Sequence, residues 1–208
     1  MRILATAFLI AAACSTAAVL AAAPASAATA YGENLLKNPG AESGSPGAVV
    51  PRWETDTDFK VVPYGSTGVP SKKQGKAIDG GEQLFSTGPY SVNFDACGSG
   101  LQFITITRRN KDIDSGKVKI TLSGYLGTKS ISDSATVTVQ FRDGNNHQIG
   151  SRQLTIGPVS TAGKLLEDSA SRKVPAGTRI LRVQLLGNTV EQTCDAFFDN
   201  LSVVLELR

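Results

Sequence analysis

The chain has 208 residues, of which 41% are hydrophobic, and its 21 Lys and Arg residues against 18 Asp and Glu residues give a formal net charge of +3. This weak, scattered charge excludes the basic surface of a nucleic-acid-binding protein, so we expect no nucleic-acid partner. Beyond residues 1–27 the chain is long enough for one domain with a sizeable core.

The N-terminus predicts export. Met1-Arg2 is a positive start, the run from Ile3 to Ala23 is almost wholly apolar or small, and Ala25-Ser26-Ala27 is an A-x-A cleavage signal. This is the pattern of a secretory signal peptide. We therefore expect cleavage after residue 27, a short extension over 28–33, and a secreted, extracellular protein.

Two alternatives to this processing stay open. Ala28-Thr29-Ala30 offers a second cleavage site, and Cys14 is a candidate lipoprotein acceptor that would leave the protein tethered to a membrane. A membrane-spanning helix is not expected, because the apolar run is rich in Ala and ends at Pro24.

Strand patterns dominate the rest of the chain. Apolar and polar residues alternate in Lys117–Leu126 and again in Ala135–Arg142, which is the period-2 pattern of a half-buried strand. The turn-forming run Asp143-Gly144-Asn145-Asn146 predicts a hairpin between the second of these and an extended segment over Gln148–Ile156. We expect further strands at Leu101–Thr107, Leu165–Val174, Arg179–Leu186 and Phe197–Leu205, and almost no helix.

Many short strands separated by Gly- and Pro-containing turns indicate a β-sandwich or a barrel. Loops are expected over 46–51, 65–75, 108–116 and 127–133, and there is no internal repeat or domain linker. The fold class that we predict is all-β, a jelly-roll β-sandwich, with residues 34–208 as its single domain.

Two cysteines follow the signal peptide, Cys97 and Cys194. Disulfides persist in exported proteins, so we predict that these two residues are bridged.

The two ends of this domain carry a family resemblance. Asn34 to Glu42 reads N-L-L-x-N-P-G-x-E, and Ala196 to Ser202 reads A-x-F-D-N-L-S. Together these motifs resemble the bacterial jelly-roll carbohydrate-binding modules with a galactose-binding-like fold. The resemblance implies a function in binding without a reaction, and it does not identify a ligand.

The resemblance also implies a structural calcium ion. In the calcium-dependent modules of this group, the ligands would correspond to the carboxylates of Glu42 and Asp199 and the carbonyl of Gly40, with further carbonyls from the loop Lys72 to Asp79. Calcium takes such oxygen ligands. The alternative is that Glu42 and Asp199 are ordinary acids that accept backbone hydrogen bonds at strand ends.

A sugar site needs aromatic rings, because the apolar face of a sugar stacks on a ring while its hydroxyls pair with nearby polar groups. Trp53 stands at the start of a strand and is expected to be buried. Tyr64, Tyr90 and Tyr125 are the predicted sugar contacts.

Catalytic signals are weak. The only histidine, His147, falls in the predicted hairpin turn, and the chain has no G-x-S-x-G or H-E-x-x-H motif. Paired carboxylates could still cleave a glycoside, and the acids that keep this open are Glu54, Asp56, Asp58, Asp79, Glu82 and Asp95.

We therefore predict a monomeric, secreted, non-catalytic module that binds a polysaccharide or cell-surface glycan and contains a structural calcium. The alternative is a structural or protein-interaction β-sandwich without a sugar site. A glycan binder should expose two or more aromatic rings together. An interaction module should instead expose an aliphatic patch or an unprotected edge strand, and an enzyme should show acids that converge.

Overall fold

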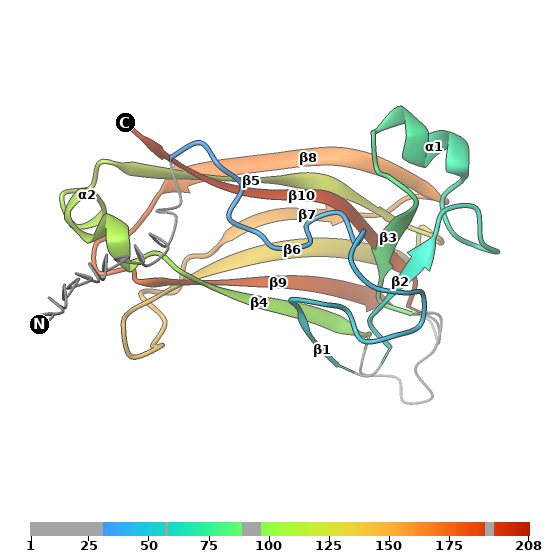
Figure 1. The fold of residues 1–208 in the computed structure, drawn as a ribbon, viewed down its shortest axis with the longest axis horizontal. Coiled ribbons are helices and arrows are strands. Elements are labelled where there is room, and N and C mark those ends of the chain that lie inside the picture. The colour runs from blue at the N-terminus through green and yellow to red at the C-terminus, as the bar shows by residue number, and fades with distance from the viewer. Residues whose placement is uncertain (1–30, 57, 89–96, 190–193) are drawn as a thin grey trace, which may run out of the picture.

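The computed structural model describes residues 31–56, 58–88, 97–189 and 194–208, and it forms two antiparallel sheets packed face to face (Figure 1). The first sheet has the order β1-β4-β9-β6-β7. Its strands are β1 (Glu54–Thr55), β4 (Ser99–Thr105), β9 (Ile180–Thr189), β6 (Asp133–Arg142) and β7 (Leu154–Val159). The second sheet has the order β2-β3-β10-β5-β8. Its strands are β2 (Lys60–Pro63), β3 (Gln83–Ser86), β10 (Ala196–Leu207), β5 (Val118–Thr128) and β8 (Lys164–Lys173).

The fold is a jelly-roll β-sandwich, as predicted. Alternation along the strands builds it, because one set of side chains from each sheet enters a common core. From β5 the core receives Val118, Ile120, Leu122 and Leu126, and from β6 it receives Ala135, Val137, Val139 and Phe141. The opposite set of each strand is left for the outer faces.

The N-terminal segment closes one side of the sandwich, where Figure 1 shows it running between the two sheets. Asn34 forms an isolated bridge with Val204 of β10, and its side chain donates to the carbonyl of Leu201 at 2.8 Å. On the other side, the Lys37 N–H donates to Gln102 Oε1 of β4 at 2.8 Å. The first and last segments of the domain thus lie side by side.

The predicted hairpin is present. β6 and β7 pair antiparallel, and Asp143 Oδ1 in the turn accepts the N–H groups of Asn145 and His147, each at 2.9 Å. The paired part of β7 begins at Leu154, later than the expected extended run from Gln148, because the chain leaves β6 after a single bridge between Arg142 and Gln148.

Short helices occupy two segments that were expected to be loops. The helix α1 (Lys72–Ala77) starts at Ser71, whose hydroxyl accepts the Gln74 N–H at 3.3 Å, as N-cap residues do. A 3-10 turn over Thr107–Arg109 leads into α2 (Asn110–Asp114). These pieces are too short to show a helical period, which is why the sequence pattern missed them. No helix in the described part of the chain is long and apolar enough to cross a membrane.

Candidate functional site

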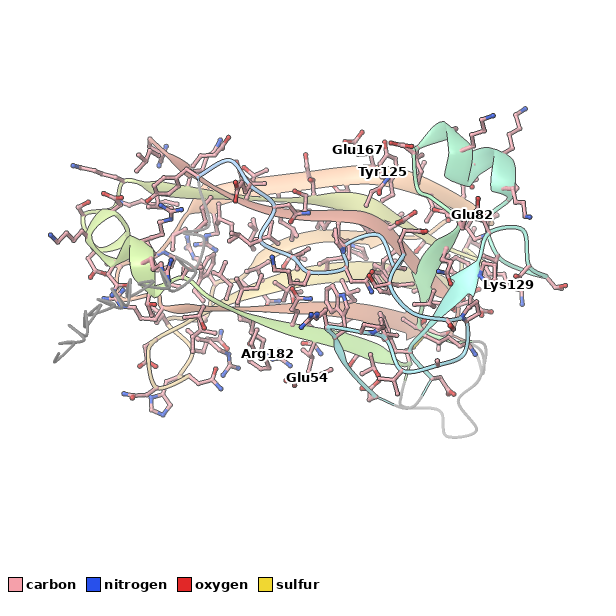
Figure 2. The ribbon with its side chains drawn as sticks, viewed as in Figure 1. Glu54, Glu82, Tyr125, Lys129, Glu167 and Arg182 are labelled. Atoms are coloured by element: carbon pink, nitrogen blue, oxygen red, sulfur yellow. A yellow bond between two sulfur atoms is a disulfide. The ribbon has the colours of Figure 1, made fainter. Side chains whose placement is uncertain are left out.

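The outer face of the first sheet carries polar side chains on its central strands. In β9, Leu181, Val183 and Leu185 enter the core, so Arg182 and Gln184 point outward. In β6 the outward set is Thr138, Gln140 and Arg142. Figure 2 shows Arg182 and Glu54 on the side of this sheet that faces away from the second sheet.

The strand register aligns these side chains in rows. Phe103 of β4 lies opposite Arg182, and Arg182 lies opposite Gln140. The neighbouring row runs from Glu54 through Leu101, Gln184 and Thr138 to Thr155. We call the surface formed by Leu101, Phe103, Gln140, Arg142, Arg182 and Gln184 the Phe103 face; Thr138, on the same side of the sheet, is 4% exposed and buried between them.

Hydrogen bonds hold the long side chains of this face in place. Arg182 Nη1 donates to Gln184 Oε1 at 2.8 Å, and Arg142 Nη2 donates to Gln140 Oε1 at 3.1 Å. Each guanidinium group is thereby fixed beside an amide. The face presents oriented donors and acceptors, which lowers the entropy lost when a polar ligand binds.

Phe103 supplies the apolar part of the face. Its side chain is 40% exposed, and it is the only aromatic residue among the large exposed hydrophobic residues that the described ranges contain. A hollow of about 300 Å³ lies beside it, lined by Leu35, Lys37, Arg52, Gln102, Phe103, Ile104 and Thr105. An exposed ring between amides, guanidinium groups and a hollow can stack on a sugar while its hydroxyls find partners.

The prediction that Tyr64 contacts sugar at the surface is wrong. Tyr64 is 2% exposed and packs with Leu84, Leu165 and Phe197 in a second apolar cluster on the outer side of the second sheet. Its hydroxyl donates to Asp199. The loop that holds Tyr64 folds back over the sheet, and Gln74 of α1 anchors this covering to Leu165 by a 3.2 Å hydrogen bond.

The other two tyrosines do not form a platform with Tyr64. Tyr125 projects outward from β5 as expected, but it is half-buried against the second apolar cluster (Figure 2). Tyr90 lies outside the described residues. Trp53 is 5% exposed, as expected, and its ring packs edge-on against Phe85 with centroids 5.4 Å apart.

The predicted calcium ligands converge at a different place, around the turn Gly80-Gly81. A methyl group built on Gly81 would lie 2.6 Å from Glu42 Oε1, and one built on Gly80 would overlap Asp199 Oδ2. The two carboxylates therefore flank one dipeptide. A methyl group on Gly40 would lie 3.3 Å from Asp199 Oδ1, so the third predicted residue is adjacent.

Asp199 is the unusual member of this group. It is fully buried, and in the described part of the chain no Lys, Arg or His forms an ion pair with it. Burial raises the pKa of Asp199 to about 7, the hydrogen bonds from Tyr64 and from the Asn200 N–H oppose the rise, and the charge of Glu42 adds to it. A buried acid beside a second carboxylate is a site that a cation would stabilise.

The other carboxylate, that of Glu42, accepts hydrogen bonds from backbone N–H groups. This is what we expect under the alternative to calcium, in which Glu42 and Asp199 are ordinary acids at strand ends. Glu42 Oε1 receives the N–H groups of Glu82 at 3.1 Å and Gln83 at 2.9 Å. The expected source of further carbonyls, residues 72–79, is mostly α1, and the Ile78 carbonyl accepts Asn200 Nδ2 at 2.7 Å. The two carboxylates are oxygen ligands of the kind that calcium takes, but helix formation removes most of the loop that was expected to supply further carbonyls.

The predicted disulfide is present between Cys97 and Cys194, with Cα atoms 5.5 Å apart.

No cluster of three or more His, Cys, Asp or Glu side chains able to hold a metal occurs in residues 31–56, 58–88, 97–189 and 194–208. Of the acids that kept glycoside cleavage open, Asp56 receives the N–H and the hydroxyl of Ser99, and Asp95 lies outside the described residues. His147 is exposed in the hairpin turn, 3.6 Å from Asp143.

The solved structures similar to this chain include several carbohydrate-binding modules. A family 16 carbohydrate-binding module superposes with a TM-score of 0.53 at 17% identity, covering 82% of this chain and 99% of that one. TmCBM61, solved in complex with beta-1,4-galactotriose, gives 0.50 at 13% identity, covering 85% and 99%. At such low identity the likeness shows the fold alone.

The enzymatically active domain of bacteriophage CBA120 tailspike protein 4 also superposes, with a TM-score of 0.54 at 12% identity. The match covers 83% of this chain and 21% of the tailspike chain. No protein-family model matches the sequence, and no curated protein matches it either.

The residues of the Phe103 face were not predicted as site residues. The signal was present in part, since alternation already placed Thr138, Gln140 and Arg142 on the side away from the core. The runs Gln140-Phe141-Arg142 and Arg182-Val183-Gln184 both show Arg and Gln two positions apart. Only the sheet order, with β9 between β4 and β6, brings them beside Phe103.

Proposed function

We propose that this protein is a secreted, non-catalytic carbohydrate-binding module whose ligand site is the Phe103 face. The observation that carries the proposal is the exposed Phe103 ring in register with Arg182 and Gln140 on a hydrogen-bonded polar sheet. The jelly-roll fold supports it, because the chain shares this fold with a family 16 carbohydrate-binding module and with TmCBM61, which was solved in complex with beta-1,4-galactotriose.

The proposal departs from the sequence-based one in its contacts. We expected two or more rings on one surface, and the described residues expose one, Phe103. A single ring supports the proposal because amide and guanidinium groups surround it and can form hydrogen bonds with the hydroxyl groups of flanking sugars.

Affinity electrophoresis of the mature protein in gels that contain neutral and acidic polysaccharides tests this function. We expect at least one polysaccharide to retard the wild type, and Phe103→Ala to migrate as it does without ligand. Leu166→Ala is the matched control, because Leu166 is 50% exposed but lies on β8 of the second sheet. If no glycan retards the wild type, the protein is not a carbohydrate-binding module.

The non-catalytic part of the proposal rests on the fold, which this chain shares with carbohydrate-binding modules. The tailspike match does not argue for activity, because this chain spans a fifth of that protein. Incubation with any retained polysaccharide should release no new reducing ends; their release at a rate above the buffer control would show an enzyme.

We further propose that Glu42 and Asp199 share a calcium ion. The support is the buried Asp199 carboxyl next to Glu42 and Gly40, for which the described part of the chain supplies no cationic side chain. An ion that binds only the folded state raises the melting temperature by mass action. Equal melting curves in calcium and in chelator would leave Glu42 and Asp199 as hydrogen-bonded acids.

Export is part of the proposal because of the N-terminal pattern and the Cys97–Cys194 disulfide, a bond that persists in oxidising compartments. Mass spectrometry of the protein from its natural host should find an N-terminus at Ala28. A start at Tyr31 would place cleavage at the second site, and a lipid on Cys14 would replace release by membrane attachment.

A further inference from the structure

The arginines of the Phe103 face indicate which class of glycan this face binds. We propose that its ligand is an anionic polysaccharide, whose carboxylate or sulfate groups bind between Arg182, Arg142 and the basic hollow beside Phe103. The inference rests on the proposed function and specifies its ligand class.

The first observation is that two like charges share the face. Arg182 and Arg142 lie on the neighbouring strands β9 and β6, one row apart, since Arg182 pairs with Gln140. Burial lowers the pKa of Arg182, and the charge of Arg142 lowers it further. Both causes disfavour the charged form of Arg182. Folding therefore brings the two guanidinium groups together at a cost in free energy.

No carboxylate offsets that cost in the described residues. Neither Arg142 nor Arg182 forms an ion pair there, whereas Arg179 pairs with Asp114 at 2.7 Å. The acid on this side, Glu54, stands in the row of Leu101 and Gln184, with β4 between it and β9. The partners of both arginines are neutral amide and carbonyl groups, so their positive charge remains for a ligand.

Arg142 is held more tightly than Arg182. Its Nη1 donates to the Asn146 carbonyl at 2.6 Å and its Nη2 to Gln140, while its buried Nε has no hydrogen-bond partner among the described residues. It therefore acts as a fixed positive charge. Arg182, with one hydrogen bond to Gln184 in the described region, is the residue placed to meet an anion through its guanidinium fork.

Positive charge continues on the other side of Phe103. Lys37 and Arg52 line the hollow of about 300 Å³ that Phe103 borders, and Gln102 holds both segments by donating to the Lys37 carbonyl at 3.0 Å and the Arg52 carbonyl at 3.1 Å. None of the described residues that line the hollow is acidic. A ring flanked on both sides by cations fits a chain of sugars with repeated negative groups.

The test compares matched polymers that differ in charge. Polygalacturonate and its fully methyl-esterified form share a backbone, and dextran sulfate and dextran form the sulfate pair. Binding of the wild type is measured by isothermal titration calorimetry at low salt and again at high salt. We expect one charged polymer to bind and its neutral counterpart to bind at least about tenfold more weakly, because charge-assisted hydrogen bonds are roughly twice as strong as neutral ones.

Two variants make the test specific. Arg182→Gln should weaken binding to the charged polymer about tenfold or more and reduce its salt dependence. Arg172→Gln is the control, because Arg172 lies on β8, the edge strand of the second sheet, and its guanidinium group packs 5.5 Å from the ring centre of the core residue Phe141. It should bind as the wild type does, and melting curves establish that each variant is folded.

The outcomes separate this inference from the function on which it rests. Equal affinity for a charged polymer and its neutral counterpart, or binding of neutral glycans alone, overturns the anionic ligand and leaves a carbohydrate-binding module. Failure to bind any polymer overturns both. Preference for polygalacturonate over dextran sulfate identifies carboxylate as the recognised group, and the reverse identifies sulfate.

Discussion

Asp199 is the residue whose surroundings determine how the stability of the protein should respond to pH and to calcium. It is fully buried, accepts a hydrogen bond from Tyr64, and lies across the Gly80-Gly81 turn from Glu42. Burial is also the main cause that raises the pKa of the Tyr64 hydroxyl well above its usual range, so Tyr64 remains a donor at every physiological pH. The charge state of this site therefore depends on Asp199.

Without calcium, this acid should make stability fall as pH rises. Its pKa is about 7 in the folded protein and near 3.8 in the unfolded chain, so between these values the folded state binds more protons. The stability contributed by the protonated carboxyl is fully present below about pH 4 and is lost as the pH rises to 7. Above pH 7 this contribution no longer changes, and the total loss is on the order of a few kcal/mol. The pKa of Asp195 is also raised, chiefly by burial, and acts in the same direction.

Melting curves in chelator from pH 4 to pH 8 measure this loss. Calcium should abolish most of it, because the ion stabilises the carboxylate. Asp199→Asn keeps an acceptor for Tyr64, so it should lack both this part of the pH dependence and the response to calcium. A wild-type melting temperature that rises from pH 4 to pH 7 in chelator would refute the assignment.

Trp53 illustrates the opposite kind of residue, one that packs and does not bind. It is 5% exposed, contacts Phe85, and its indole N–H donates to the Asn38 carbonyl at 3.2 Å. Trp53→Ala should reduce the free energy of unfolding by about 3–5 kcal/mol, as large-to-small core changes do. Denaturant unfolding checks this value; a loss below about 1 kcal/mol would mean that the site collapses around the smaller side chain.

Among the elements, the turn between α1 and β3 positions both carboxylates. A methyl group on Gly80 would lie 2.7 Å from the Tyr64 hydroxyl and overlap Asp199, so this turn can approach the acid only with glycine at that position. Gly80→Ala should cost about 1–3 kcal/mol, the range for overpacking, and should weaken any calcium response.

Gly144→Ala is the matched control for that substitution. The nearest neighbour of a methyl group there is Arg179 Cγ at 3.9 Å, an ordinary contact distance. We expect its melting temperature to equal that of the wild type. If both variants melt alike, Gly80 does not limit the approach of the turn to Asp199.

The strands were largely predictable and the site was not. Alternation located β5 and β6, because each buries one face and a period of two marks it. The further strands that were expected correspond to β4, β8, β9 and β10. Pairing is non-local, so the sequence could not show that β9 lies between β4 and β6 and aligns Arg182 with Phe103. The tyrosine prediction failed at Tyr64 for a related reason, since α1 and its flanking loop cover the second sheet.

At the scale of the whole molecule, the disulfide connects the two sheets. Cys97 precedes β4 in the first sheet and Cys194 precedes β10 in the second. The two residues are 97 positions apart. A bond that closes so long a loop restricts the unfolded chain strongly, which makes the disulfide a stabiliser of the sandwich.

Replacing both cysteines by alanine should lower the free energy of unfolding by about 4–5 kcal/mol in the chain-entropy account. Glycan binding by the folded variant should persist, because the Phe103 face is made by other residues of β4, β6 and β9. Denaturant unfolding and calorimetric titration measure the two properties. A folded double variant without glycan affinity would show that the site extends to this end of the sandwich.

The central claim is that the Phe103 face is where the ligand binds. The most direct test is a two-dimensional NMR titration of the labelled protein with the glycan that retards it most in affinity electrophoresis. We predict that the amide shifts that change most cluster on β4, β9 and β6, at Phe103, Arg182, Gln184 and Gln140. Changes confined to Tyr125, α1 and β8 on the second sheet would contradict the claim and place the site on the opposite side of the molecule.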